Sequence, residues 1–135
     1  MVDPKYILKE TAAWTWSLFP NQSYLGRMQL TLRRPCEGSL ASLTGNEWLE
    51  LQSCLKTFET VLTETFAPDR FNYVQLGNVW PQVHVHAIPR YQSAPQWQGI
   101  SFPDQRWGDV PIPEPASPIS EAHTLDLAKE LQYKL

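Results

Sequence analysis

Polar and apolar residues alternate strictly from Gln82 to Ala87, in the run Gln-Val-His-Val-His-Ala. A β-strand turns successive side chains to opposite faces. The pattern therefore predicts a strand with Gln82, His84 and His86 on one face and apolar side chains on the other. Such a strand lines a cleft with its polar face and rests on helices with its apolar face. Proline cannot donate a hydrogen bond to a sheet ladder, so we expect the strand to end near Pro89.

Further strands are predicted from the same kind of alternation and from turn-forming residues between them. The segments are Tyr6–Lys9, Ala13–Phe19, Arg27–Arg33 and Phe71–Leu76. Turn-forming residues from Pro20 to Ser23 predict that the middle two form a hairpin. The second strand of this hairpin places Gln29 and Thr31 opposite its apolar residues, which predicts one water-exposed face.

Two helices are predicted. Thr44 is followed three residues later by Glu47, which is the pattern of a capping box, and apolar residues then recur every three or four positions. This long helix is expected to end before Pro68, because proline disfavours a helical conformation in the residue ahead of it. A terminal helix starts near residue 119, with an apolar stripe that must dock on another surface, and His123 is expected on its exposed side.

The segment from Tyr91 to Pro118 is rich in proline and tryptophan and shows no periodicity. We expect an ordered loop across the body of the protein, in which Asp104, Arg106 and Trp107 are candidates for completing a pocket. The overall expectation is one α+β domain, with an antiparallel sheet of about five strands and one long helix packed on it. Residues 1–118 form this domain, including the extension from about residue 91, and residues 119–135 form the terminal helix, which docks on the domain or on a dimer partner.

Composition narrows the function classes. The chain of 135 residues has 42% apolar residues and a formal charge of −3, which is typical of a globular protein of one domain. No basic cluster favours duplex nucleic acid, and no hydrophobic run approaches the ~18 residues of a membrane span. Cys36 and Cys54 form no C-x-x-C pair and no secretory signal is evident, so a cytoplasmic protein with free thiols is the best interpretation.

The histidines of the predicted strand allow three interpretations. A neutral imidazole is a nucleophile near neutral pH, so His84 and His86 suit attack on a carbonyl or phosphoryl centre. They also resemble half of a metal site, but such a site needs further ligands, and the nearest downstream acids are Asp104 and Asp109. The third interpretation is a row of polar residues on the solvated side of a sheet.

The run Gln-Val-His-Val-His-Ala-Ile-Pro-Arg resembles the signature of the histidine triad (HIT) superfamily, and Leu76-Gly77-Asn78 resembles the lead-in of its bacterial members. The resemblance extends roughly from Tyr6 to Arg90. It implies a homodimer whose sheets join across the interface. It also implies that His84 attacks the α-phosphorus of a nucleotide to give a nucleotidyl-histidine, while His86 contacts the phosphate and donates a proton to the leaving group.

Two positions depart from the family pattern. Gln82 stands where the first triad histidine is expected, and its backbone carbonyl is a candidate for fixing the tautomer of His84. Arg27, after Leu25-Gly26, stands where many members have a fourth histidine, and arginine is suited either to a phosphate contact or to the surface.

Amide side chains complete the candidate substrate site. By resemblance Asn72 meets the phosphate and Asn21 points toward the sugar, while Asn78 lies close to the histidine row. A simple turn-forming role is the alternative for Asn21 and Asn78. Trp80 is the first choice among the tryptophans for stacking on a base, and ordinary packing is its alternative.

The resulting hypothesis is a hydrolase or nucleotidyltransferase acting on a small-molecule nucleotide, of the dinucleoside polyphosphate or nucleoside phosphoramidate type. His84, His86 and Gln82 are its catalytic residues, and no cofactor or metal is required for the attacking step. The alternatives are a nucleotide-binding or regulatory module with weak or no turnover, and a protein with a histidine-based metal site.

Overall fold

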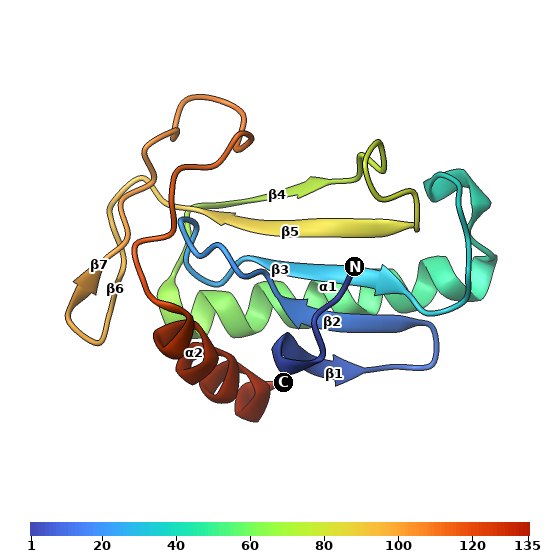
Figure 1. Cartoon of the computed structure of the whole chain (residues 1–135), viewed down its shortest axis with the longest axis horizontal. Coiled ribbons are helices and arrows are strands. Elements are labelled where there is room, and N and C mark those ends of the chain that lie inside the picture. Colours follow the sequence, from blue (N-terminus) through green and yellow to red (C-terminus); the bar gives the residue numbers. More distant parts are fainter.

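The computed structural model describes the whole chain, Met1 to Leu135. One antiparallel sheet has the strand order β1-β2-β3-β5-β4 (Figure 1). Its strands are β1 (Ile7–Glu10), β2 (Trp14–Leu18), β3 (Met28–Leu32), β4 (Arg70–Val74) and β5 (His84–Arg90). The helices are α1 (Gly45–Phe66), α2 (Glu121–Lys134) and the 3-10 turns η1 (Pro4–Tyr6) and η2 (Leu40–Ser42), and a short hairpin contains β6 (Gln96–Trp97) and β7 (Ile100–Ser101). The predicted α+β architecture is confirmed.

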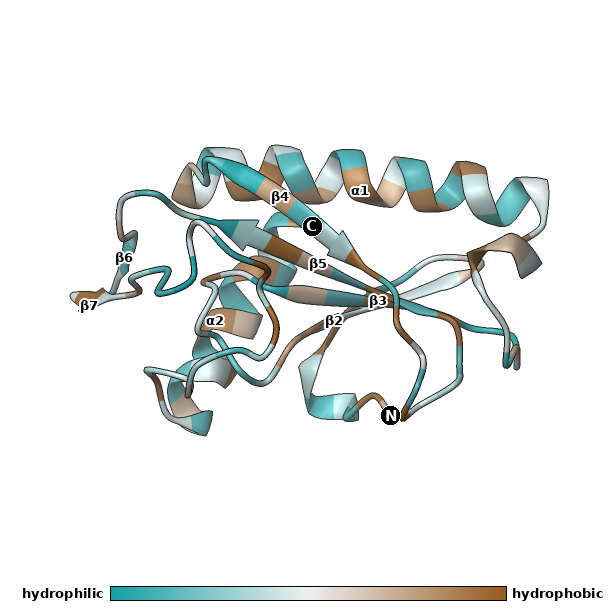
Figure 2. Ribbon diagram, turned by 90° about the horizontal axis from the view of Figure 1, so that it is seen from above, coloured by the Kyte–Doolittle hydropathy of each residue, from teal (hydrophilic) through white to brown (hydrophobic).

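The long helix α1 covers one face of the sheet, while the N-terminal segment and the C-terminal extension lie on the other (Figure 2). The apolar side of the histidine strand, Val83, Val85 and Ala87, belongs to the buried core together with Leu51 and Phe58 of α1, as the alternation predicted. This arrangement leaves the histidines on the face away from α1.

The predicted start and end of α1 are confirmed. The Thr44 hydroxyl accepts a hydrogen bond from the Glu47 amide at 3.2 Å, and the Glu47 carboxylate accepts one from the Thr44 amide at 2.8 Å. The helix ends at Phe66, and Ala67 closes it in the left-handed region with φ of 50°. Pro68 follows directly, as expected from its effect on the preceding residue.

The prediction of a water-exposed face on β3 is wrong. Gln29 and Thr31 are buried, with 8% and 6% of their surfaces exposed, and Gln29 Nε2 donates to Thr31 Oγ1 at 3.2 Å. The N-terminal segment crosses this side of the sheet, and Val2 borders both cavities that adjoin these residues (Figure 1). Alternation correctly predicted which side chains share a face, but not which chain segment covers that face.

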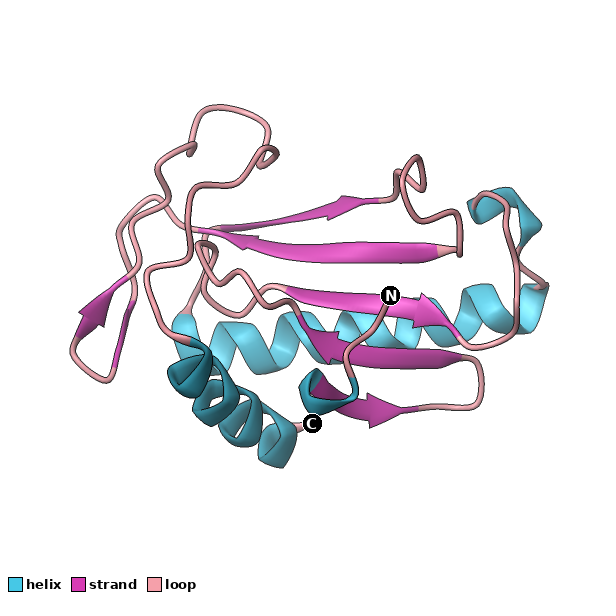
Figure 3. Cartoon of the chain, in the orientation of Figure 1, coloured by secondary structure: helices cyan, strands magenta, loops and turns pink.

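The last third of the chain, residues 91–135, wraps around the sheet. Figure 3 shows the extension running as a long loop from the end of β5 to α2, interrupted by the β6–β7 hairpin. The Tyr24 hydroxyl donates to the Pro111 carbonyl at 2.6 Å, which ties this loop to the turn before β3. Helix α2 lies beside β1, where Lys5 Nζ contacts Glu121 at 2.9 Å, and His123 is exposed on it as predicted. Neither helix is both long and apolar enough to cross a membrane.

Candidate active site

His84 and His86 lie side by side on β5, with ring centroids 5.1 Å apart. Their register partners on the neighbouring strand are Thr31 and Gln29, so both rings stand on the polar face of the sheet. The strand begins at His84 rather than at Gln82, which forms only an isolated bridge with Glu37. The imidazoles are therefore held by the regular part of the ladder.

The backbone before β5 orients the His84 ring. His84 Nδ1 lies 2.6 Å from the Gln82 carbonyl oxygen, and a carbonyl oxygen can only accept a hydrogen bond. In the neutral ring Nδ1 therefore carries the proton, and Nε2 has the lone pair. Trp80 covers the same ring, with centroids 5.0 Å apart and 33° between the planes. His84 is only 7% exposed, so the ring of this candidate nucleophile is both oriented and shielded.

The Gln82 side chain does not reach His84. Its Oε1 accepts from the Cys36 amide at 3.0 Å, and its Nε2 donates to the carbonyls of Leu32 and Arg34, both at 2.8 Å. The side chain thus fastens the segment before β5 to the chain that leaves β3. Only the backbone carbonyl of Gln82 contacts the candidate nucleophile.

His86 is a neutral imidazole in this environment. Its Nδ1 lies 3.2 Å from Arg27 Nη2, and the Phe19 ring meets it edge-on at 5.3 Å between centroids. Burial lowers the pKa of His86 to about 3, with further contributions from the charges of Arg27 and His84. A proton donor near neutral pH must carry the proton there, which burial disfavours for His86, and the predicted role of His86 as proton donor stays a prediction.

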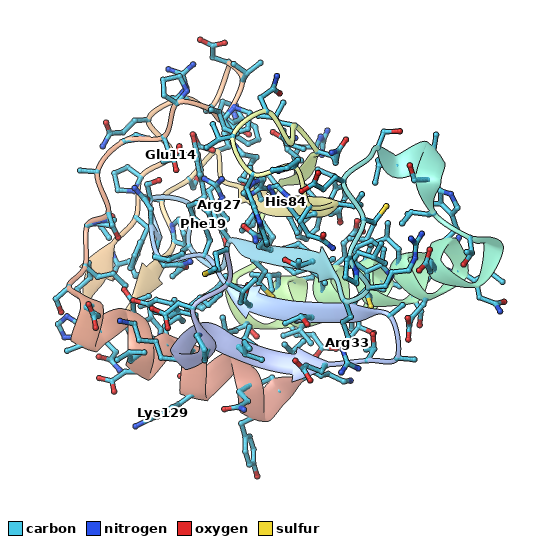
Figure 4. The ribbon with its side chains drawn as sticks, turned by 45° about the vertical axis from the view of Figure 1, so that its right-hand side comes forward. Phe19, Arg27, Arg33, His84, Glu114 and Lys129 are labelled. Atoms are coloured by element: carbon cyan, nitrogen blue, oxygen red, sulfur yellow. The ribbon has the colours of Figure 1, made fainter.

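Arg27 is sealed beneath the C-terminal extension. Only 1% of the residue is exposed, its guanidinium lies 3.8 Å from the Phe19 ring centroid, and its Nη1 is 3.3 Å from a Glu114 carboxylate oxygen. Burial lowers the pKa of Arg27, and the Nε and Nη1 donors have no partner in hydrogen-bonding geometry. Figure 4 shows Arg27, Phe19 and Glu114 gathered above the sheet near His84, whereas Arg33 and Lys129 lie away from them.

Close packing before β3 fixes the backbone at this position. Gly26, just ahead of Arg27, has φ of 91°, a left-handed conformation that favours glycine. A Cβ at Gly26 would lie 2.3 Å from the terminal methyl of Leu62 in α1, so the Leu62 side chain would have to shift to admit another residue.

The three amide candidates occupy different surroundings. Asn72 Oδ1 accepts from Arg90 Nη1 at 2.8 Å, and its Nδ2 donates to no protein acceptor. Asn21 Nδ2 donates to the Pro115 carbonyl at 2.8 Å, and its Oδ1 accepts from a backbone amide in its own turn. Asn78 is exposed on the loop before Trp80 and makes no side-chain hydrogen bond. Their predicted contacts with substrate stay predictions.

Asp104 and Arg106, the charged candidates of the extension, bind Arg90 of β5. Asp104 holds the guanidinium of Arg90 through two hydrogen bonds of 2.7 and 3.1 Å, and the Arg106 carbonyl accepts a third at 2.5 Å. The network lies at the far end of β5 from His84, so neither side chain meets the histidine row. It anchors the extension that brings Glu114 to Arg27.

Phe19 and Glu114 are site residues that the sequence did not reveal. The alternation predicts Phe19 only as the last residue of a strand, and Glu114 lies in the proline-rich segment, where no periodicity places a side chain. The aromatic content of the extension was the one signal that this segment packs against the body.

Two cavities adjoin the register partners of the histidines. One, of about 410 Å³, is next to Gln29, and the other, of about 370 Å³, is next to Thr31. The first is lined by side chains that include Tyr6, Ser17, Phe19, Asn21, Gln29 and Glu114, and the second by Thr15, Thr31, Trp80 and Gln82. No three His, Cys, Asp or Glu side chains are grouped closely enough to hold a metal ion. Neither histidine lines either cavity, and both cavities lie beside the β3 residues that pair with the histidines.

Comparison with solved structures identifies the fold. A histidine triad protein from Marinobacter aquaeolei VT8 superposes with a TM-score of 0.72 and 25% identity, over 96% of this chain and 87% of that one. A hypothetical histidine triad nucleotide-binding protein from Sulfolobus tokodaii gives 0.73 at 16% identity, over 96% and 82%. The diadenosine triphosphate hydrolase of Plasmodium falciparum gives 0.67 at 15% identity, over 98% and 77%.

The chain therefore has the histidine triad fold, as the motif around His84 suggested. No family model matches the sequence, and no curated protein matches it.

Proposed function

We propose that this protein is a nucleotide-phosphate hydrolase or nucleotidyltransferase that acts through a nucleotidyl intermediate on His84. The observation that carries the proposal is the 2.6 Å contact between His84 Nδ1 and the Gln82 carbonyl. Because this contact places the proton of the neutral ring on Nδ1, Nε2 carries the lone pair that attacks phosphorus. The attacking step as proposed needs no metal ion or other cofactor.

A nucleotide fits the surroundings of the histidines. The cavity of about 410 Å³ beside Gln29 offers an aromatic wall, Phe19, and amide and hydroxyl groups for a nucleoside. Gln29 is the register partner of His86, which puts this cavity next to the histidine row. The fold is shared with a diadenosine triphosphate hydrolase and with a protein described as nucleotide-binding, which supports the same class of ligand.

The reaction divides into two displacements. In the first, His84 Nε2 attacks the α-phosphorus, a P–N bond forms, and the bond from phosphorus to the leaving group breaks. In the second, a water or another acceptor attacks phosphorus, its proton passes to solvent, and the P–N electron pair returns to His84. Covalent catalysis lowers the barrier by splitting one displacement into two, and fixed hydrogen-bond donors stabilise the charge that develops on the phosphoryl oxygens.

Trapping the intermediate tests this function. The purified protein is mixed in excess with adenosine phosphoramidate or diadenosine triphosphate labelled at the α-phosphorus, and the reaction is quenched in alkali, in which phosphorus–histidine bonds survive. Label on the peptide that contains His84 is expected. His84→Ala abolishes it, whereas His123→Ala, a matched change of an exposed histidine on α2, retains it. Label that persists in the His84→Ala variant contradicts the proposal.

A nucleotide-binding module is the second candidate. Trp80 covers the His84 ring and leaves the residue 7% exposed, which favours a site that holds ligand without turnover. The trapping experiment separates the candidates, because a module binds adenosine monophosphate saturably and gives no label on His84. Stoichiometric metal in protein purified without an affinity tag points instead to a histidine metal site.

We further propose that the protein is a homodimer. A hollow of about 840 Å³ runs along α1, includes neither histidine in its lining, and is bordered by the exposed Trp48 and Leu49. β4 is an edge strand of the sheet, and the hydroxyl of its Tyr73 donates to Glu59, which lines this hollow. Light scattering coupled to size exclusion tests the dimer, and Leu49→Glu is expected to shift it to monomer.

A further inference from the structure

We propose that Arg27 is a positioning residue that fixes His86 as a hydrogen-bond donor through Nε2, and that the site consequently favours leaving groups that depart as anions. The inference rests on the proposed function, because it concerns the leaving group of the first displacement. It selects dinucleoside polyphosphates over phosphoramidates of alkylamines as the substrate class.

The contact between the two side chains determines the tautomer. A guanidinium has N–H donors and no acceptor, so the 3.2 Å approach of Arg27 Nη2 to His86 Nδ1 requires a lone pair on Nδ1. The single ring proton of neutral His86 therefore sits on Nε2. Arg27 cannot take another position easily, because it is 1% exposed and lies between Phe19 and Glu114.

The charges around His86 keep it neutral. His84 lies on its own strand, Arg27 approaches from the turn before β3, and Glu114 of the extension pairs with the far side of Arg27. The other neighbours do not titrate: Phe19 at the end of β2, Gln29 on β3 and Val74 on β4. No carboxylate contacts the imidazole itself, so nothing offsets the cost of burying an imidazolium beside a guanidinium.

A neutral donor has a specific consequence for the chemistry. When His84 Nε2 forms the P–N bond and the P–O bond breaks, the electron pair stays on the departing oxygen of a nucleoside phosphate, which is stable as an anion. His86 Nε2–H stabilises that oxygen by a hydrogen bond and keeps its own proton. An alkylamine must instead receive a proton as the P–N bond to it breaks, and no imidazolium is present to donate one. General acid catalysis typically contributes ~10²–10⁴-fold, so its absence penalises amine leaving groups strongly.

The tautomer is measured directly, and independently of catalysis. Histidine ¹⁵N shifts from two-bond correlation spectra of the labelled protein distinguish Nε2–H from Nδ1–H. We expect His86 as the neutral Nε2–H form at neutral pH, still uncharged near pH ~5, where an ordinary histidine is protonated. An Nδ1–H tautomer, or a charged His86 at pH ~6, overturns the proposal.

Variants of Arg27 and Glu114 test whether Arg27 sets the tautomer and the titration of His86. Arg27→Met retains a flexible chain of similar length but removes the donor and the charge, and is expected to raise the protonation midpoint of His86 toward the ordinary histidine range. Arg27→Met leaves the carboxylate of Glu114 without its partner. The double variant Arg27→Met/Glu114→Gln removes that carboxylate as well, and it replaces the single variant in the measurement if Arg27→Met alone unfolds the protein. Glu114→Gln alone is expected to keep the Nε2–H tautomer. An unchanged His86 titration in either folded Arg27 variant contradicts the assignment.

Single-turnover labelling of His84 tests the leaving-group class. Wild-type protein is expected to form the intermediate from diadenosine triphosphate about 100-fold or more faster than from an adenosine alkylphosphoramidate, and Arg27→Met is expected to narrow this ratio as pH falls below ~6. Equal rates for the two substrates contradict the inference while leaving the proposed function intact. Absence of label from both contradicts the proposed function, and the tautomer measurement then still decides the role of Arg27.

Discussion

The indole of Trp80 lies over the imidazole of His84, with 5.0 Å between the ring centroids. The chain reverses direction between the antiparallel strands β4 and β5. The loop that makes this reversal contains Gly77 and Asn78 and brings Trp80 onto the His84 ring. The sequence makes Trp80 a candidate for stacking on a base, and in the structure it lies on the candidate nucleophile itself.

Trp80→Ala is expected to uncover His84. Loss of one aromatic contact costs roughly 0.5–1.5 kcal/mol, so formation of the labelled intermediate should slow by about two- to tenfold. Carbethoxylation of His84 by diethyl pyrocarbonate should accelerate, while that of the exposed His123 stays constant as an internal reference. Trp80→Phe keeps a planar ring and should behave like the wild type. Equal modification rates of His84 in all three proteins contradict the shielding role.

Gln82→Ala is expected to reduce stability more than chemistry. The side chain satisfies one backbone amide and two backbone carbonyls, at 2.8 to 3.0 Å, and each hydrogen bond contributes about 0.5–1.5 kcal/mol. Chemical denaturation should show a loss of roughly 2–4 kcal/mol. The substitution does not remove the backbone carbonyl that orients His84, so the folded variant should still form the labelled intermediate on His84. Gln92→Ala, at an exposed glutamine without side-chain hydrogen bonds, serves as the control and should be neutral.

Asp104→Ala is expected to be among the most destabilising single changes. The carboxylate of Asp104 and the guanidinium of Arg90 are 1% and 4% exposed and 2.7 Å apart. Removing one partner of a buried pair typically costs about 3–5 kcal/mol, because the remaining charge is left uncompensated. Asp109→Asn breaks a pair in which Asp109 is 69% exposed, and should cost about 1 kcal/mol or less. Similar losses for the two variants, measured by urea denaturation, would show that the Arg90 network does not anchor the extension.

Glu47 should make stability depend on pH in the acidic range. Hydrogen bonds from Arg34 and from the Thr44 amide lower the pKa of Glu47 from 4.5 to about 2. The ionised Glu47 therefore contributes fully to the free energy of unfolding at pH values above its ordinary pKa of 4.5. This contribution is lost as the pH falls through about 2.

Glu47→Gln tests this contribution. The variant should be less stable than the wild type at neutral pH, by roughly 1 kcal/mol or less because Arg34 is partly exposed, and the gap should close as the pH falls from 4.5 toward 2. Glu64→Gln, at an exposed position of the same helix, should parallel the wild type throughout. A gap between Glu47→Gln and the wild type that stays constant with pH contradicts the assigned pKa.

The sequence by itself determined the elements and the faces of the strands. Alternation around His84 places both imidazoles on one face, and Thr44 with Glu47 marks the first turn of α1. These features depend on interactions between residues a few positions apart, which local periodicity and capping chemistry express directly. The HIT-like fold was predicted for the same reason, since the motif spans one strand and the turn before it.

Only the tertiary structure decided what surrounds the two histidines. Arg27 meets His86 across 59 positions of sequence, and Glu114 reaches Arg27 from an extension without periodicity. Burial of Gln29 and Thr31 likewise depends on which segment crosses the sheet. These contacts arise from sheet register and from the path of a proline-rich loop, and no local pattern encodes either, because the partners are chosen by packing in three dimensions.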